Sequence, residues 1–193
     1  FIFFQSAKNP ITKYYSSKIK SIKKIENSIF DYVLETCKNT KIFILKQNSN
    51  HNILSQCKIA LTTVGANTAE LAAINLPMIV VLPTQHLNAM NAWDGIFGII
   101  GKITLLNRIQ TFLIKRWYLK NNKFFAWPNI KANQQIIPER IGIISPKDIS
   151  DEAIFLLNEK DILLEQKINL SKIRGKKGAV KKLSNLILET IAN

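Results

Sequence analysis

Two neighbouring stretches decide the fold: IALTTVGANTAEL at residues 59–71 and PMIVVL at residues 77–82. The apolar run 59–63 predicts a strand, and residues 68–74 have helical spacing. The continuous apolar run 77–82 predicts a strand that is buried on both faces, as in a parallel sheet. Strand, helix and strand at this spacing predict an α/β fold, with a Rossmann-like parallel sheet and helices on both faces.

The loop between the first strand and the helix has the residue types of a phosphate-binding turn. Gly65 allows the backbone to approach a ligand, and the N–H groups at the following helix start are unpaired and partly positive. We therefore expect a diphosphate here. The alternative is an ordinary turn, in which Glu70 only satisfies the helix start. The candidate residues of this loop for binding a diphosphate ligand are Thr63, Gly65, Ala66, Asn67, Thr68 and Glu70.

A second candidate stretch, WPNIKANQQIIPE, occupies residues 127–139. It is polar and bounded by prolines, which predicts a loop followed by a short helix. Its amide side chains are adaptable hydrogen-bonding groups, and its candidate ligand residues are Asn129, Gln134 and Glu139. No Ser–His–Asp order, P-loop or metal-ligand spacing occurs in the sequence, so no metal site is expected.

The remainder of the chain extends the same architecture. Residues 18–39 carry isoleucines at helical spacing and predict an amphipathic helix. Residues 1–4 and 41–45 predict strands, and residues 53–57 a short helix. After Pro146 the pattern is helical, which predicts a helical C-terminal tail. The chain is expected to form one domain with three parts: a core over 1–85, a basic aromatic amphipathic insertion over 86–126, and a final part over 127–193.

The insertion contains a predicted helix at 105–119 with basic and aromatic residues. A basic amphipathic helix of this kind is suited to an anionic membrane surface. A packed helix hairpin with a solvated lysine face fits the pattern equally well. The candidate membrane-contact residues are Arg108, Phe112, Lys115, Arg116, Trp117 and Lys120.

Composition narrows the function classes. Of 193 residues, 47% are hydrophobic, which excludes a disordered chain. Two cysteines without a CxxC pair argue against a disulfide scaffold or zinc module and are compatible with a reducing compartment. Two histidines are too few for a His-based metal site. The net charge of +14 comes with many Ile and Asn residues, so AT-rich codons account for part of the lysine excess. We therefore give a nucleic-acid partner little weight.

The order GANTAEL, LPMIVV and PN…IIPE resembles the C-terminal half of the lipid-A-disaccharide synthase family, over about residues 40–190. The stretches at 93–95 and 126–129 are most similar to divergent cyanobacterial and plastid relatives. The resemblance implies one half of a GT-B fold with a UDP-sugar in the cleft below it. The loop at 65–70 would then face the diphosphate and sugar. Either Glu70 or Glu139 would hold the ribose hydroxyls, and Asn129 would lie near the donor.

The chain also departs from the family pattern. Asn133 and Gln134 stand where the family usually has Gly-Arg, and losing that cation removes a charge-assisted phosphate contact of roughly 1.5–3 kcal/mol. The Gly-Ser-Arg loop is not recognisable near residues 6–8. We expect an N-terminal acceptor domain, with the general base and the catalytic residues, to be missing, so that this chain alone is inactive.

The resemblance therefore implies a glycosyltransferase that moves a sugar from a UDP-sugar donor to a lipid-linked acceptor, with no cofactor. Its expected location is cytoplasmic and peripheral on the inner membrane, or a plastid if the gene is organellar. Its partners would be the UDP-sugar, the lipid-linked acceptor and an anionic membrane surface. The alternative is a non-catalytic, membrane-associated relative of the same fold.

Overall fold

The computed structural model describes residues 2–4, 18–26, 28–46, 51–83, 124–175 and 178–192. The chain divides into two compact units, Phe1–Ile53 and Leu54–Asn193. The sequence does not predict this division. The expected boundary at residue 85 falls between described stretches.

The first unit is a four-stranded sheet with the order β1-β4-β3-β2. Its strands are β1 (Ile2–Phe4), β2 (Ile19–Lys24), β3 (Phe30–Thr36) and β4 (Lys41–Leu45). β1 runs parallel to β4, whereas β2, β3 and β4 form an antiparallel meander. The expected strands at both ends of this unit are thus present, and a short helix, α2 (His51–Leu54), follows the sheet.

The predicted helix over residues 18–39 is wrong, because this stretch folds as the β2–β3 hairpin. Ile22 pairs with Leu34, which in turn pairs with Ile42, so one row of apolar side chains crosses three strands. Leu34 and Ile44 are buried in the small core that results. The isoleucines that suggested helical spacing are β-branched and suit a pleated, half-buried surface. Strand pairing therefore overrides the local period.

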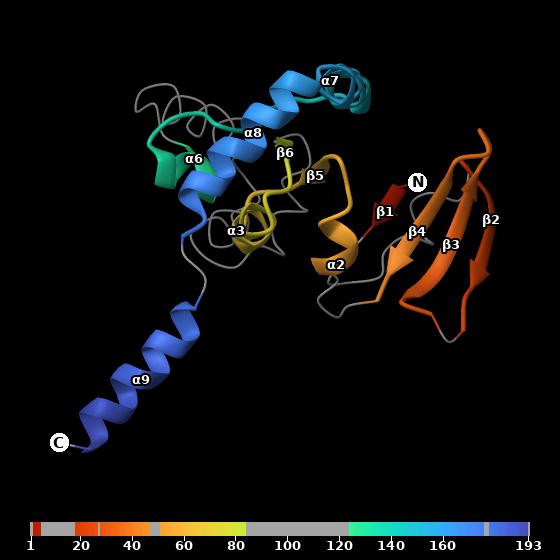
Figure 1. Ribbon diagram of the computed structural model, residues 1–193. Coiled ribbons are helices and arrows are strands. Elements are labelled where there is room, and N and C mark those ends of the chain that lie inside the picture. Colours follow the sequence, from red (N-terminus) through yellow and green to blue (C-terminus); the bar gives the residue numbers. More distant parts are fainter. Residues whose placement is uncertain are drawn as a thin grey trace, which may run out of the picture. The chain divides into compact units, whose positions relative to one another are not determined.

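The second unit contains a three-stranded parallel sheet with the order β5-β6-β7 (Figure 1). Its strands are β5 (Ala60–Thr62), β6 (Met78–Pro83) and β7 (Glu139–Gly142). Its helices are α3 (Ala66–Ala73), α6 (Trp127–Ala132), α7 (Pro146–Asn158), α8 (Lys160–Ile173) and α9 (Ala179–Ala192). The predicted α/β class with a parallel sheet is confirmed.

The core of this unit forms where α3, α6 and α8 pack together against β6. Met78, Val80 and Leu170 are at most 1% exposed there. β6 is the central strand, and its uninterrupted apolar sequence reflects burial on both faces. Among the described residues, no helix has both the length and the apolar run that crossing a membrane requires.

The second candidate stretch differs from its prediction. The helix comes first, as α6, and the loop at 133–138 follows it into β7. Pro128 lies in the first turn of α6, where its missing N–H costs nothing, and Asn133 ends the helix with a left-handed φ of 51°. The sequence analysis missed the short strand β7. The predicted helices after Pro146 are confirmed as α7, α8 and α9.

The expected insertion at 86–126 lies outside the described residues except for its last three, 124–126. The predicted helix at 105–119 and all six candidate membrane-contact residues lie in that gap. The stretch at residues 6–8 lies outside the described residues as well.

Candidate functional site

The turn from β5 into α3 is built around Gly65. This residue is the N-cap of α3 and has a φ of 152°, a conformation that residues with a side chain rarely adopt. A Cβ at this position would lie 2.9 Å from Oδ1 of Asn67. The Asn67 side chain is held in place because its Nδ2 donates to Oγ1 of Thr62 and, at 3.2 Å, to the carbonyl of Thr63. The turn therefore requires glycine at position 65.

The first turn of α3 presents two backbone donors. The N–H groups of Ala66 and Asn67 make no hydrogen bond with the residues that the structure describes, whereas the N–H of Thr68 donates to the Gly65 carbonyl. Ala66, Gly65 and Thr63 are exposed, so these donors lie at the surface. Helix N-terminal N–H groups of this kind attract anions.

Thr68 connects this turn to the second candidate stretch. Its side chain is fully buried; Oγ1 donates to the Gly65 carbonyl at 2.8 Å and accepts from the N–H of Trp127 at 3.3 Å. A single hydroxyl therefore joins the start of α3 to the start of α6, 59 residues further along the chain. The two motifs that the sequence analysis singled out are neighbours in space.

Asn129 and Glu139 form a buried polar network beneath α6. Asn129 donates from Nδ2 to Oε1 of Glu139 at 2.7 Å and to the carbonyl of Ile137 at 2.9 Å. Its Oδ1 accepts from the N–H groups of Ile136 and Ile137 at 2.8 and 3.0 Å. The side chain of Asn129 thus has a partner at each polar atom, and it fixes the loop between α6 and β7.

Glu139 completes the same network from β7. Its two oxygens accept from the N–H groups of Phe125 at 2.9 Å and Ala126 at 3.1 Å, in addition to Asn129. Ala126 is the N-cap of α6 and has no side-chain cap of its own, so the Glu139 carboxylate satisfies the open donors at this helix start. The carboxylate is 6% exposed and is occupied by three protein donors.

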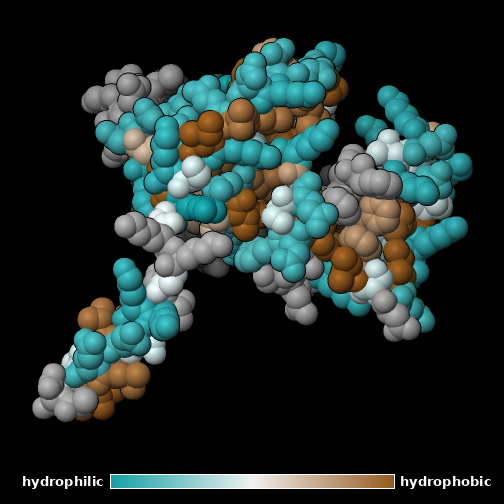
Figure 2. Space-filling model, in the orientation of Figure 1, coloured by the Kyte–Doolittle hydropathy of each residue, from teal (hydrophilic) through white to brown (hydrophobic). Residues whose placement is uncertain are grey.

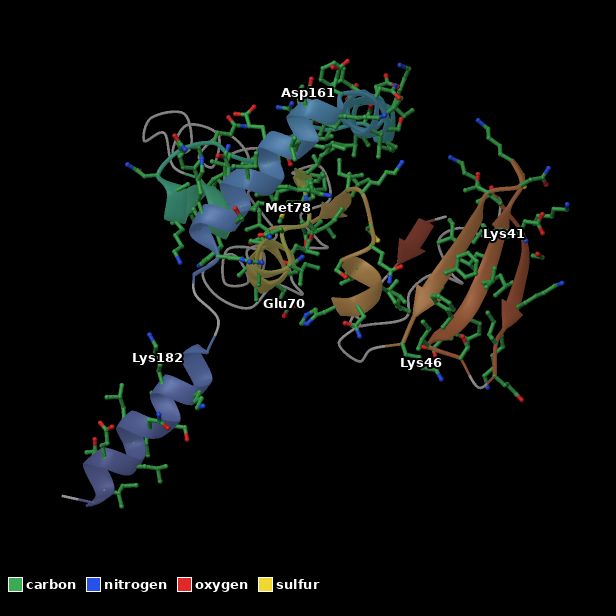
Figure 3. All side chains as sticks on the ribbon, in the orientation of Figure 1. Lys41, Lys46, Glu70, Met78, Asp161 and Lys182 are labelled. Atoms are coloured by element: carbon green, nitrogen blue, oxygen red, sulfur yellow. The ribbon has the colours of Figure 1, made fainter. Side chains whose placement is uncertain are left out.

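The predicted site residues therefore fall into two groups. Thr63, Gly65, Ala66, Glu70 and Gln134 are exposed, and Asn67 is half-buried. Thr68, Asn129 and Glu139 are buried and hydrogen-bonded within the protein. Glu70 projects outward from α3 (Figure 3), and its carboxylate accepts no hydrogen bond from the described residues.

The departure from the family pattern at 133–134 has two different consequences. Asn133 has a left-handed backbone, which glycine and asparagine both tolerate, so this replacement preserves the turn. Gln134 is exposed and neutral, so the cation of the family pattern is lost. Another cation, Lys131, lies one turn before this position and was not among the predicted site residues. Its Nζ lies 4.8 Å from the centroid of the Trp127 ring. The i, i+4 spacing of this pair would have revealed it had α6 been predicted as a helix.

Among the described residues, no group of three or more His, Cys, Asp or Glu side chains is arranged to hold a metal ion. A groove of about 890 Å³ lies between β7, α7 and α8. The Gly65 turn does not line this groove, whereas residues 135–138 at the end of the second candidate stretch do.

A parallel sheet with helices, whose strand-to-helix turn has N–H groups without partners among the described residues, is an α/β architecture consistent with one half of a GT-B fold. The chain is 28% identical over 145 residues to a protein named lipid-A-disaccharide synthase from Sulfurihydrogenibium sp. (strain YO3AOP1). The match covers 73% of this chain and 31% of that relative, so the chain spans about a third of the relative's length. No family model matches the chain, and no solved structure matches it. The similarity confirms the resemblance seen in the motifs.

Proposed function

We propose that this chain is the donor-binding part of a glycosyltransferase of the lipid-A-disaccharide synthase kind. The full protein would transfer a sugar from a UDP-sugar to a lipid-linked acceptor. The observation that carries the proposal is the start of α3, where Gly65 and Ala66 are exposed and the N–H groups of Ala66 and Asn67 have no hydrogen-bond partner among the described residues. An anionic diphosphate is the chemistry that such a turn recognises.

The roles of the loop residues follow from their exposure. The N–H groups of Ala66 and Asn67 would bind the diphosphate and stabilise the charge that develops on the leaving UDP. The hydroxyl of Thr63, which is exposed, would add a further donor. Neither a metal ion nor a cofactor is part of this proposal.

Glu70 is the better candidate for the ribose hydroxyls. The two glutamates are equal candidates in the sequence, but the Glu139 carboxylate already accepts from three protein donors. The Glu70 carboxylate is exposed and accepts no hydrogen bond from the described residues. In this proposal Thr68, Asn129 and Glu139 are positioning residues, because they hold the α3 turn and α6 together.

The general base would come from the acceptor domain of the full protein, and the acceptor would be reached at an anionic membrane surface of the cytoplasm or a plastid. Residues 108–120 are proposed to contact that surface. A non-catalytic relative of the same fold is the second candidate, and one observation favours it. The exposed, neutral Gln134 replaces the cation of the family's second motif.

Titrating UDP into the folded 193-residue chain, followed by amide chemical shifts, tests donor binding. We expect saturable shifts in Gly65, Ala66 and Asn67, and smaller shifts with UMP because the second phosphate is absent. Glu70→Gln should weaken binding several-fold, and Glu159→Gln, a matched change at an exposed helix end, should not. Absence of saturable shifts up to millimolar UDP would overturn the proposal. Flotation with anionic vesicles in that case would favour the non-catalytic relative.

A further inference from the structure

The C-terminal helix α9 carries a large exposed apolar face. Its leucine and isoleucine side chains are 50–77% exposed. Leu183, Leu186, Ile187 and Ile191 recur at helical spacing and lie on one side, and Figure 2 shows hydrophobic and hydrophilic surfaces on different sides of this helix. An isolated helix of 14 residues is only marginally stable in water. α9 therefore needs a partner surface.

The groove between β7, α7 and α8 is an unfilled apolar surface in the same unit. The apolar lining residues that are exposed or half-exposed are Ile141, Ile143, Ile144, Ile149, Phe155 and Ile162. Phe155 is 54% exposed although it lines the groove. An occupant with an apolar face would remove this surface from water.

The groove is also acidic, in a chain that is otherwise strongly basic. Four carboxylates, Asp148, Asp151, Glu152 and Glu165, line it together with a single arginine, Arg140. Arg140 pairs with Glu152, and Lys147 pairs with Asp151. Glu165 has no ion-pair partner among the described residues. The occupant expected from these charges is basic.

A buried, unpartnered acceptor indicates that the occupant also carries a hydrogen-bond donor. Gln166 lines the groove and is 5% exposed, yet its Oε1 accepts no hydrogen bond from the described residues. Leaving a buried acceptor unpaired is unfavourable. A hydrogen-bond donor that enters the groove beside Gln166 would pair with this oxygen.

The chain itself provides an occupant with all three properties. α9 and the connection before it contain four lysines: Lys176, Lys177, Lys181 and Lys182. Lys182 projects from α9 (Figure 3) and lies one turn before Leu186, at the edge of the apolar face. The connection from α8 includes Gly175 and Gly178 with φ of 83° and 94°, conformations that permit a tight reversal.

We propose that α9 folds back along α8 as an αα-hairpin and occupies this groove. Both helices have 14 residues, about 21 Å, so α9 reaches the far end of α8. Ile162, Glu165, Gln166 and Asn169 mark the groove-facing side of α8. An antiparallel hairpin brings Leu186 to the level of Gln166, Ile191 to that of Ile162, and Lys182 within reach of the unpaired acceptor.

A disulfide cross-link in the 193-residue chain tests this hairpin. In a Cys37→Ser, Cys57→Ala background, Ile162→Cys with Ile191→Cys should form an intramolecular disulfide under mild oxidation. The control pair, Ile162→Cys with Glu189→Cys, places the second thiol at the same level but on the polar face of α9. It should cross-link at least tenfold more slowly.

Hydrogen exchange provides the second measurement. The amides of α9 should be protected to about the same extent as those of α8, and Leu186→Asp should abolish this protection while Asn185→Asp retains it. Equal cross-linking of both pairs, cross-links only between two copies, or unprotected α9 amides would each overturn the proposal. So would protection of α9 that requires anionic vesicles, because that result would assign the helix to a lipid surface.

Discussion

Asn129 donates a 2.7 Å hydrogen bond to Glu139, and this pair joins the first turns of α6 to the first residue of β7. Both side chains are buried, and together they satisfy the N–H groups of Phe125, Ala126, Ile136 and Ile137. The most specific residues of the second motif thus position the backbone. In the proposed function, the ligand would contact the exposed turn at Gly65, which Thr68 links to this network.

Glu139→Gln is expected to lower the free energy of unfolding by about 1–3 kcal/mol. The carboxamide replaces one acceptor oxygen by an NH₂ group, which leaves the N–H of Phe125 or Ala126 unpaired in the interior. Urea unfolding followed by circular dichroism measures the change. The matched control is Glu70→Gln, an exposed glutamate on α3, which should stay within about 0.5 kcal/mol of the wild type. Equal midpoints for the two variants would contradict the scaffold role.

The parallel sheet and its α3 turn are predictable from sequence because their signals are local. A fully apolar strand such as β6 is distinctive, and Gly65 marks the place where the chain turns. The β2–β3 hairpin was not predictable in this way, since its stability comes from pairing Ile22 with Leu34 and Leu34 with Ile42 across strands. Spacing along the chain does not contain that information.

For the candidate site, the sequence proposes residues but does not show which of them are buried and which are exposed. In the sequence, nothing distinguishes Glu70 from Glu139, because each is a glutamate within a polar motif. Only the fold shows that one carboxylate caps α6 and the other faces solvent. The bond from Trp127 to Thr68 joins residues 59 positions apart, so no local pattern reveals it.

Gly65→Ala is expected to destabilise the turn by about 1–2 kcal/mol and to weaken UDP binding. The new methyl group would meet Asn67 Oδ1 at 2.9 Å, and the φ of 152° strains any residue with a side chain. Thermal unfolding and UDP titration measure the two effects. Ala66→Gly, at the adjacent position, is the control and should retain the turn. If Gly65→Ala bound UDP as tightly as the wild type, the close approach of the backbone to the ligand would be disproved.

Thr68→Val should uncouple the start of α6 from the start of α3. Valine has nearly the same shape but cannot accept from the N–H of Trp127 or donate to the Gly65 carbonyl. The loss is expected to be about 1–2 kcal/mol, with faster hydrogen exchange at Trp127. Thr68→Ser keeps the hydroxyl and should restore slow exchange at Trp127 despite its missing methyl group. Slow exchange in Thr68→Val would show that another acceptor holds this amide.

The start of α7 is expected to lose stability in acid. Ser145 and Asp148 form a capping box: the Ser145 N–H donates to the Asp148 carboxylate at 3.0 Å, and the Asp148 N–H donates to Ser145 Oγ at 3.1 Å. The hydrogen bonds from Ser145 hold the pKa of Asp148 below its usual 3.8 in the folded chain. The contribution of the carboxylate is therefore fully present above its unfolded pKa and is lost as the pH falls through the lower, folded pKa. The difference in thermal midpoint between wild type and Asp148→Asn should accordingly be largest near neutral pH and vanish in strong acid.

In Ser145→Ala, the Asp148 carboxyl shift followed by NMR should titrate closer to 3.8, because the Ser145 hydroxyl is gone. An unchanged titration in that variant would show that the capping box does not set the pKa of Asp148.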